Sequence, residues 1–272
     1  AFSEGFEGGL TTAHSMRLVN TRYYAGASMF WDKRAATLED QTTQPIQHAV
    51  EMGFDAAHGG IDSLIRKLQV LPYYPELFKM VFGSPDITED RIQLALAQFI
   101  RSIESFESRF DEGFAQVFNP ALPNANVGTD FPNYTAEENL GKTLFLTPPV
   151  AGGAGCAGCH SIPTFSLDVA SRSNGLDAGE TIIFKAPSLK NVGLESHFMH
   201  DGRLTSLEEV IEHYDSGVQD GPALDNRLRG PGGVPQQLNL TAAEKAALKA
   251  FLLTLNDVAL TTTAAYSDPF LP

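Results

Sequence analysis

Apolar residues recur at helical spacing along most of the chain. One stripe lies within residues 61–68, and a second lies within residues 92–103. The apolar positions are Ile61, Leu64, Ile65 and Leu68 in the first stripe, and Ile92, Leu96, Phe99 and Ile103 in the second. Both stripes keep their apolar residues on one face of a helix, so each predicts a core helix. No convincing alternating strand pattern is found, and we therefore expect an all-α fold.

Capping signals mark the start of two further helices. Thr135 and Glu138 form a capping-box pattern ahead of a helix that runs through Phe145, and Thr241 and Glu244 repeat this pattern near the C-terminus. The apolar stripe of the later helix is Leu248, Phe251, Leu252 and Leu255. Gly141 has no side chain, so we expect the earlier helix to cross closely against this stripe.

A third capping pattern and a breaker-rich segment complete the organisation. Thr205 and Glu208 predict a short helix, with Tyr214 on its apolar face beside Leu207, Val210 and Ile211. Residues 119–132 are rich in Pro, Asn and Gly, which favours a linker between two halves of the chain.

Composition excludes several classes of protein. The 272 residues are 43% hydrophobic and 19% charged, which is typical of a globular chain, and no apolar run reaches the ~18 residues of a membrane span. The net charge of −14 disfavours nucleic acid and anionic lipid as partners and favours a basic redox partner. The chain opens at Ala1 without a Met or a signal peptide, so we expect that processing or trimming removed an upstream segment.

Both cysteines of the chain lie in one motif. Cys156 and Cys159 flank two small residues, and His160 follows directly, which is the attachment pattern of c-type haem. In this pattern the thiols bond to the porphyrin and the histidine reaches the iron as its proximal ligand. A zinc site needs about four ligands and a thioredoxin-like pair needs a β-α-β context, and neither is found. The distal ligand stays open between Met199 and Tyr214. Haem c also predicts a location outside the cytoplasm.

Several longer segments resemble one family, the bacterial di-haem cytochrome c peroxidases and their MauG-type relatives. They are FWDKRAATLEDQTTQPIQHAVEMG (30–53), AQFIRSIESFESRFD (97–111), the haem motif, FKAPSLKNVGL (184–194) and MHDGRLTSLEEVIEHYDSG (199–217). The resemblance implies two cytochrome c-like helical domains with one haem c each. We expect an incomplete N-terminal peroxidatic domain at 1–118, a linker at 119–134 and a haem domain at 135–272. Only the second haem motif is present, so the first is expected upstream of Ala1.

The resemblance also implies roles for individual residues of the N-terminal part. Phe30, Gln41 and Glu51 match positions over the open face of the first haem. Glu51 is the expected general acid/base, which moves a proton between the oxygens of hydrogen peroxide. Gln41 would orient the peroxide and Phe30 would restrict the pocket. Trp31 matches a position between the haems, where an indole can relay electrons.

Further implications concern the second haem and a metal ion. MauG-type members carry Tyr at the position of Tyr214, so the resemblance favours Tyr214 over Met199 as distal ligand, and it places His200 close to the same haem. In some members a distal His binds the first haem. The matching position in this chain lies near Phe6, so we expect this chain to lack that histidine. His14 falls where the family often has a calcium-binding Asn, so calcium near Glu195 and His197 is a weakened expectation.

Three functions follow as hypotheses. The first is reduction of hydrogen peroxide, with electrons from a small c-type cytochrome or a cupredoxin entering at the His160 haem. The second is MauG-like oxidation of aromatic residues in a partner protein, and the third is a mono-haem electron-transfer module without a catalytic pocket. The family further suggests a periplasmic location and a homodimer.

Overall fold

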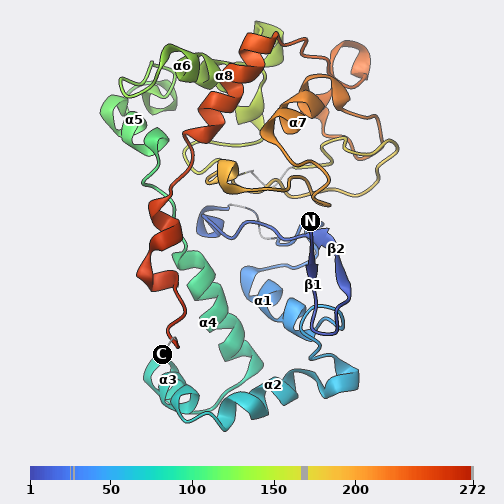
Figure 1. Cartoon of the computed structure of the whole chain (residues 1–272), viewed down its shortest axis with the longest axis vertical. Coiled ribbons are helices and arrows are strands. Elements are labelled where there is room, and N and C mark those ends of the chain that lie inside the picture. The colour runs from blue at the N-terminus through green and yellow to red at the C-terminus, as the bar shows by residue number, and fades with distance from the viewer. Residues whose placement is uncertain (25, 27, 167–170, 271–272) are drawn as a thin grey trace.

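The computed structural model describes residues 1–24, 26, 28–166 and 171–270. The described part is mostly helical, as predicted, with a single small antiparallel hairpin. Its elements are β1 (Phe2–Glu4), β2 (Leu10–His14), α1 (Leu38–Gln47), α2 (Gly60–Gln69), α3 (Tyr73–Phe82), α4 (Glu89–Ser102), α5 (Arg109–Val117), α6 (Ala136–Leu146), α7 (Leu207–Glu212) and α8 (Ala242–Leu253). In Figure 1, α5 to α8 form an upper half, and α1 to α4 with the hairpin form a lower half.

The hairpin is the element that the sequence pattern missed. Every residue of β1 is exposed, and β2 has no buried residue, so neither strand has the buried face that produces an alternating pattern. The two strands are held together by their backbone pairing, and neither has an apolar face.

The crossing of α6 and α8 is built as predicted. Both capping boxes, Thr135 with Glu138 and Thr241 with Glu244, are formed. A Cβ atom added to Gly141 would lie 1.9 Å from the Ala247 carbonyl oxygen and 2.8 Å from Phe251 Cβ. The two helices therefore touch at backbone level, and only glycine fits at this position.

The upper half contains the largest apolar core of the described residues. Phe110 on α5 packs edge to face against Phe165 at 4.7 Å and contacts Phe131 at 5.5 Å between ring centroids. Phe131 and Val127 are buried in the same core, although they lie in the segment that we predicted as a linker. The domain boundaries stay a prediction. The packing of Phe110 with Phe131 argues for a passage between the halves at residues 103–108, ahead of α5.

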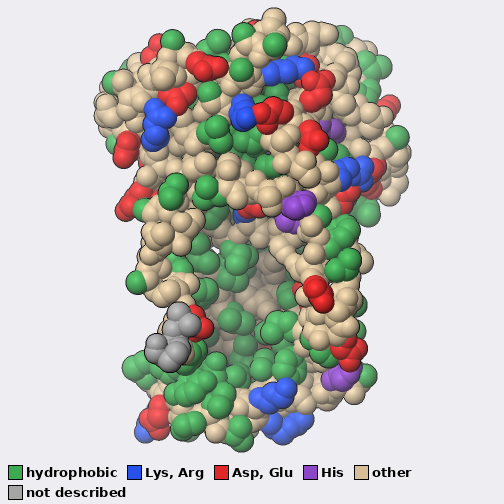
Figure 2. Space-filling view, viewed as in Figure 1, with side chains coloured by type: hydrophobic (Ala, Val, Ile, Leu, Met, Phe, Trp, Pro, Cys, Tyr) green, Lys and Arg blue, Asp and Glu red, His purple; other side chains and the backbone are tan. Residues whose placement is uncertain are grey.

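The lower half has smaller cores. No residue of α2 is buried, so its predicted role as a core helix is wrong, and only Ile65 and Leu68 pack partly against a small cluster around Phe78. On α4, Ile92 is buried but Phe99 is 48% exposed. The physical reason is an incomplete covering of these apolar faces: Figure 2 shows a hollow within the lower half, below the upper half, lined largely by hydrophobic side chains.

The C-terminal segment ties the two halves together. After α8 the chain returns along α4 and ends near α3 (Figure 1). The Tyr266 hydroxyl donates to the carbonyl of Ser102, and the Phe270 ring lies 5.2 Å from that of Tyr73. Within the described residues, no helix combines the length and hydropathy that a bilayer span requires.

Candidate haem site

The Cys-X-X-Cys-His motif forms one tight turn. Cys156–Gly158 is a 3-10 turn that follows Gly155, whose φ of 69° lies in the left-handed region that favours glycine. The amide of Cys159 donates to the Cys156 carbonyl at 3.0 Å, and the amide of His160 donates to the same oxygen at 2.9 Å. The turn brings both sulfur atoms and the imidazole to the wall of one cavity.

His160 is held in the form that binds a metal. Its Nδ1 lies 3.2 Å from the carbonyl oxygen of Phe165, so Nδ1–H donates to this oxygen and Nε2 keeps its lone pair. Burial lowers the pKa of His160 to about 4, so the ring is neutral at pH 7. A neutral, oriented imidazole is the usual ligand of haem iron.

Two adjoining cavities surround His160. The first, of about 1080 Å³ with its open mouth, is lined by Cys156, Cys159, His160 and Tyr214 and by apolar residues of α6, α7 and α8. The second, of about 820 Å³, is lined by His160 and Tyr214 again, together with Trp31, Met199 and His200. Both cavities share His160 and Tyr214 in their walls, so they adjoin each other. We call the two together the His160 hollow.

Tyr214 reaches this hollow from a π-helical turn. The capping box of α7 is formed by Ser206 and Glu209, one residue later than the predicted Thr205 and Glu208, because the Glu209 carboxylate accepts from the amides of both Thr205 and Ser206. The helix then widens into a π-turn at His213–Gly217, a feature frequent at functional sites. Burial raises the pKa of the Tyr214 phenol, and a hydrogen bond from Asn174 opposes this shift.

Met199 and His200 lie at the other end of the hollow. Met199 has a φ of 72°, which is strained for a non-glycine residue, and lines only the second cavity. Its sulfur accepts from Asn174 Nδ2 at 3.1 Å, so Asn174 lies between the two candidate distal ligands. His200 stacks on Phe184 with ring centroids 4.1 Å apart, and burial lowers its pKa.

Trp31 joins the lower half to the His160 hollow. Its indole Nε1–H donates to the carbonyl of His14 at 2.6 Å, and its own carbonyl accepts from the amide of Lys185 at 2.7 Å. The side chain lines the second cavity with His160 and Met199. The sole tryptophan of the sequence is therefore fixed at the edge of the hollow.

Buried polar atoms in the hollow fit an anionic cofactor. Arg17 lines the second cavity, and its Nε and Nη1 atoms are buried without a hydrogen-bond partner in the described part of the chain. Glu195 lies 3.8 Å from Nε, so it offers charge but no hydrogen bond. A buried guanidinium whose N–H groups lack hydrogen-bond acceptors is costly, and the carboxylate of a haem propionate would supply those acceptors. No cluster of three His, Cys, Asp or Glu residues suited to zinc occurs among the residues that the structure describes. The residues present therefore fit haem c.

Arg17 and Asn174 were missed by the sequence reasoning. Arg17 lies far from the motif in sequence, and Asn174 lies in an irregular segment, so no spacing marks either residue. A family alignment or the structure itself is needed to find them.

The three residues assigned to the first haem lie outside the His160 hollow. Phe30, Gln41 and Glu51 line neither of its two cavities. Gln41 lies on α1, and Phe30 packs in the small core of the lower half with the Arg34 guanidinium 3.6 Å above its ring. Their assignment to a separate haem stays a prediction.

Glu51 lies in the turn after α1 with its side chain 32% exposed. His48 Nδ1 accepts from the amide of Glu51 at 3.3 Å and lies 3.7 Å from a carboxylate oxygen of the same residue. The Glu51 carbonyl accepts from the amide of Phe6 at 3.0 Å. The N-terminal segment therefore fixes the turn that carries Glu51.

The residues tied to calcium lie together. The His14 ring lies 3.9 Å from a Glu195 carboxylate oxygen, and its centroid is 5.9 Å from that of His197. The His14 imidazole thus occupies the side of Glu195 that faces the hairpin. A hard cation prefers oxygen ligands, so this arrangement does not strengthen the expectation of calcium.

Comparisons with known proteins identify the family of this chain. The family model described as di-haem cytochrome c peroxidase matches residues 1–117 and 135–228. Methylamine utilization protein MauG of Methylorubrum extorquens is 32% identical over 91% of this chain and 65% of its own length. Cytochrome c551 peroxidase of Nitrosomonas europaea is 29% identical over 68% of this chain and 53% of its own length. The chain thus spans less than two thirds of either relative.

Solved structures share the fold. A MauG-like protein associated with microbial copper homeostasis superposes with a TM-score of 0.75 at 26% identity, over 99% of this chain and 83% of that one. The haem motif, the cavity around it and the extent of the sequence match lead to one conclusion. The chain belongs to the di-haem cytochrome c peroxidase family.

Proposed function

We propose that this chain is a c-type haem peroxidase that uses hydrogen peroxide. Cys156 and Cys159 would hold one haem c, His160 would bind its iron from one side, and Arg17 would pair with a propionate. When bound, the haem supplies the redox-active iron of the site. The observation that carries the proposal is the cavity that the two cysteines, His160 and Tyr214 line together.

Tyr214 is the distal ligand that we favour, with Met199 as the alternative. Tyr214 lines the cavity that contains both cysteines, whereas Met199 lines only the neighbouring one. The phenol keeps its proton in the apolar hollow because burial raises its pKa, so iron would have to displace that proton on binding. A phenolate ligand would lower the reduction potential of the haem.

The second, peroxidatic haem of the family would lie in the lower half. The apolar hollow of the lower half and the uncovered apolar faces of α2 and α4 support this location (Figure 2). Glu51 would act there as general acid/base, Gln41 would orient peroxide, and Phe30 would restrict the pocket. Trp31 would relay electrons, since its indole lies at the edge of the His160 hollow and its chain segment belongs to the lower half.

A second function is favoured by the same tyrosine. Oxidation of aromatic residues in a partner protein, as in MauG-type members, would use peroxide and the Tyr214-ligated haem. Peroxide reduction would instead draw electrons from a small c-type cytochrome or a cupredoxin. The net charge of −14 suits a basic partner in either case. We propose a periplasmic location, because haem c is attached after export.

Substitution of Glu51 tests the acid/base role. We expect Glu51→Gln to slow the reaction with hydrogen peroxide by about 10²-fold or more, the usual contribution of a general acid/base. The haem spectrum from the Cys156 motif should not change, since Glu51 lies outside the His160 hollow. Glu76→Gln on α3 is the matched control for loss of one carboxylate. Normal turnover in Glu51→Gln would refute the role.

A further inference from the structure

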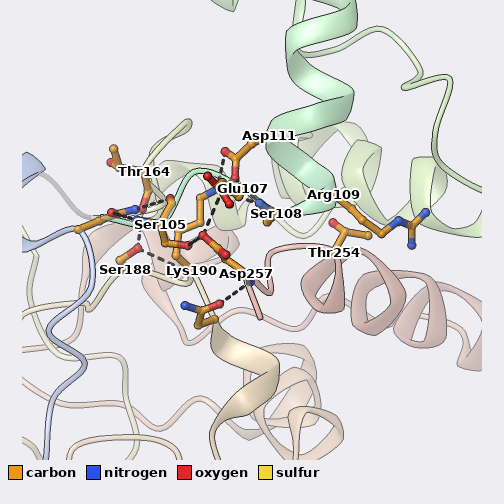
Figure 3. Close-up of polar contacts among 12 residues, drawn as sticks. Ser105, Glu107, Ser108, Arg109, Asp111, Thr164, Ser188, Lys190, Thr254 and Asp257 are labelled. Atoms are coloured by element: carbon orange, nitrogen blue, oxygen red, sulfur yellow. Dashed lines mark hydrogen bonds and ion pairs between the residues drawn. The ribbon is translucent and has the colours of Figure 1, made fainter. Parts of the chain in front are cut away.

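A buried ion pair lies beside the loop that orients His160. Lys190 is fully buried, and its Nζ donates to both carboxylate oxygens of Asp111 at 2.5 Å and to Ser108 Oγ at 3.2 Å. Asp111 also caps α5 by accepting from the amide of Ser108. Figure 3 shows Lys190 and Asp111 pointing toward each other from separate chain segments.

Ser188 links this ion pair to the loop. Its hydroxyl donates to the Thr164 carbonyl at 2.6 Å and accepts from the Lys190 amide at 3.2 Å. The neighbouring amide of Leu189 donates to the Phe165 carbonyl at 3.3 Å. The segment 188–190 therefore holds the two carbonyls of residues 164 and 165 in place.

The Phe165 carbonyl is the same oxygen that accepts from His160 Nδ1. Phe165 is fully buried at a φ of 53°, a conformation that a non-glycine residue keeps only when its surroundings fix it. The Lys190 ammonium also lies 5.8 Å from the Phe165 ring centroid, within the range of a cation–π contact. Lys190 thus supports Phe165 both through the backbone of its segment and through the ring.

We propose that Ser188, Lys190 and Asp111 form a brace that positions His160 for the iron through the Phe165 carbonyl. A hydrogen bond from Nδ1 to a fixed acceptor makes the imidazole a stronger donor to a metal. A stronger donor stabilises oxidised iron, so the brace keeps the reduction potential of the His160 haem low. This inference rests on the proposed haem at His160.

A charge-only effect would act in the opposite direction. Lys190→Met leaves the Asp111 carboxylate without its cation, and the added negative charge near the haem would lower the potential. Loss of the positioning role would instead weaken the hydrogen bond from His160 Nδ1 to the Phe165 carbonyl. This loss would raise the reduction potential. The sign of the shift therefore separates the two roles.

Lys142 provides a matched control. It is also fully buried in the upper half. Among the described residues it donates to the backbone carbonyls of Val127 and Thr129, and its ammonium lies 3.8 Å from the Phe131 ring centroid, so none of these contacts is with the His160 loop. Lys142→Met should therefore lower the free energy of unfolding, as substitution of a buried lysine does, but it should not disturb the Phe165 carbonyl. Lys190→Arg keeps the charge and the pairing with Asp111 and serves as the conservative variant.

The experiment is a redox titration of the haem-loaded full chain and its variants. Haem content per chain is measured first by pyridine haemochrome, and absence of haem at the Cys156 motif would refute the proposed function itself. With haem present, we expect Lys190→Met to raise the potential by about 59 mV, a tenfold change in the ratio of reduced to oxidised haem. Lys190→Arg and Lys142→Met should change this ratio less than about twofold on the same scale.

Ser188→Ala keeps the test valid if Lys190→Met fails to fold. It removes the link to Thr164 without changing any charge, so the positioning role predicts a smaller rise in potential. An unchanged or lowered potential in Lys190→Met, or an unchanged potential in Ser188→Ala when Lys190→Met cannot be prepared, would overturn the brace.

Discussion

The crossing of α6 and α8 predicts a large effect from one added methyl group. In Gly141→Ala the new Cβ would lie 1.9 Å from the Ala247 carbonyl oxygen, so the helices must separate by about 1 Å to reach an allowed contact of roughly 3 Å. Overpacking of a core costs about 1–3 kcal/mol, and this clash is with backbone, which places it near the upper end. The better helix propensity of Ala returns about 1 kcal/mol. The net loss is therefore about 2 kcal/mol in the free energy of unfolding.

Chemical denaturation followed by far-UV circular dichroism measures this loss. For a chain of this size about 2 kcal/mol corresponds to a fall of roughly 4–8 °C in Tm. Gly128→Ala is the control, because a Cβ at Gly128 meets no atom within 4 Å. The haem spectrum should also change in Gly141→Ala, since Phe145, Leu248 and Leu252 from these two helices line the hollow. Wild-type stability in Gly141→Ala would refute the close crossing.

Three further predictions concern the hollow. Tyr214→Phe should change the spectrum of the haem and raise its potential, whereas Met199→Leu should not; a change only in Met199→Leu would assign the distal position to Met199. If the proposed second haem is bound, Trp31→Phe should slow electron transfer between the two haems and leave each haem spectrum intact, and rapid transfer measured by stopped-flow absorbance would contradict the relay. Burial lowers the pKa of Lys185 from 10.5 to about 8, so the unfolded chain binds this proton more tightly and stability should rise with pH between those values. Lys185→Met should flatten this rise in denaturation curves recorded across that interval, and an unchanged slope would contradict it.

The caps of α6 and α8 were predicted correctly because local chemistry determines them. Thr135 and Thr241 each satisfy helix N–H groups within their own turn, so their capping boxes need no tertiary information. The role of Gly141 was also predictable, because a glycine within a helix allows a second helix to approach closely. The short cap at Thr205 was displaced by one residue because two overlapping pairs satisfy the same pattern.

Burial was harder to predict than helix formation. The stripe of α2 has a helical period, but burial depends on what covers it, and in this chain nothing buries any α2 residue fully. The segment 119–134 reads as a linker by composition, yet Phe131 and Val127 reach the core of the upper half. Period and composition describe the local chain, whereas burial is set by segments far away in the sequence.

The haem site shows the same difference between local and distant residues. Cys156, Cys159 and His160 are adjacent in sequence, so their motif predicts their chemistry directly. Arg17 and Asn174 join the hollow only through the fold, and their unsatisfied or bridging polar atoms became visible in the structure. The assignments of Glu51, Gln41 and Trp31 rest on the family resemblance and remain predictions to be tested.

The central claim is that this chain carries a covalently bound haem at Cys156 and Cys159, ligated by His160. The most direct measurement is mass spectrometry of the peptide that contains residues 155–161, after expression with a c-type haem maturation system. We predict a peptide whose mass is increased by one haem bonded through both sulfur atoms. A peptide with two unmodified thiols, from chain matured under those conditions, would contradict the account.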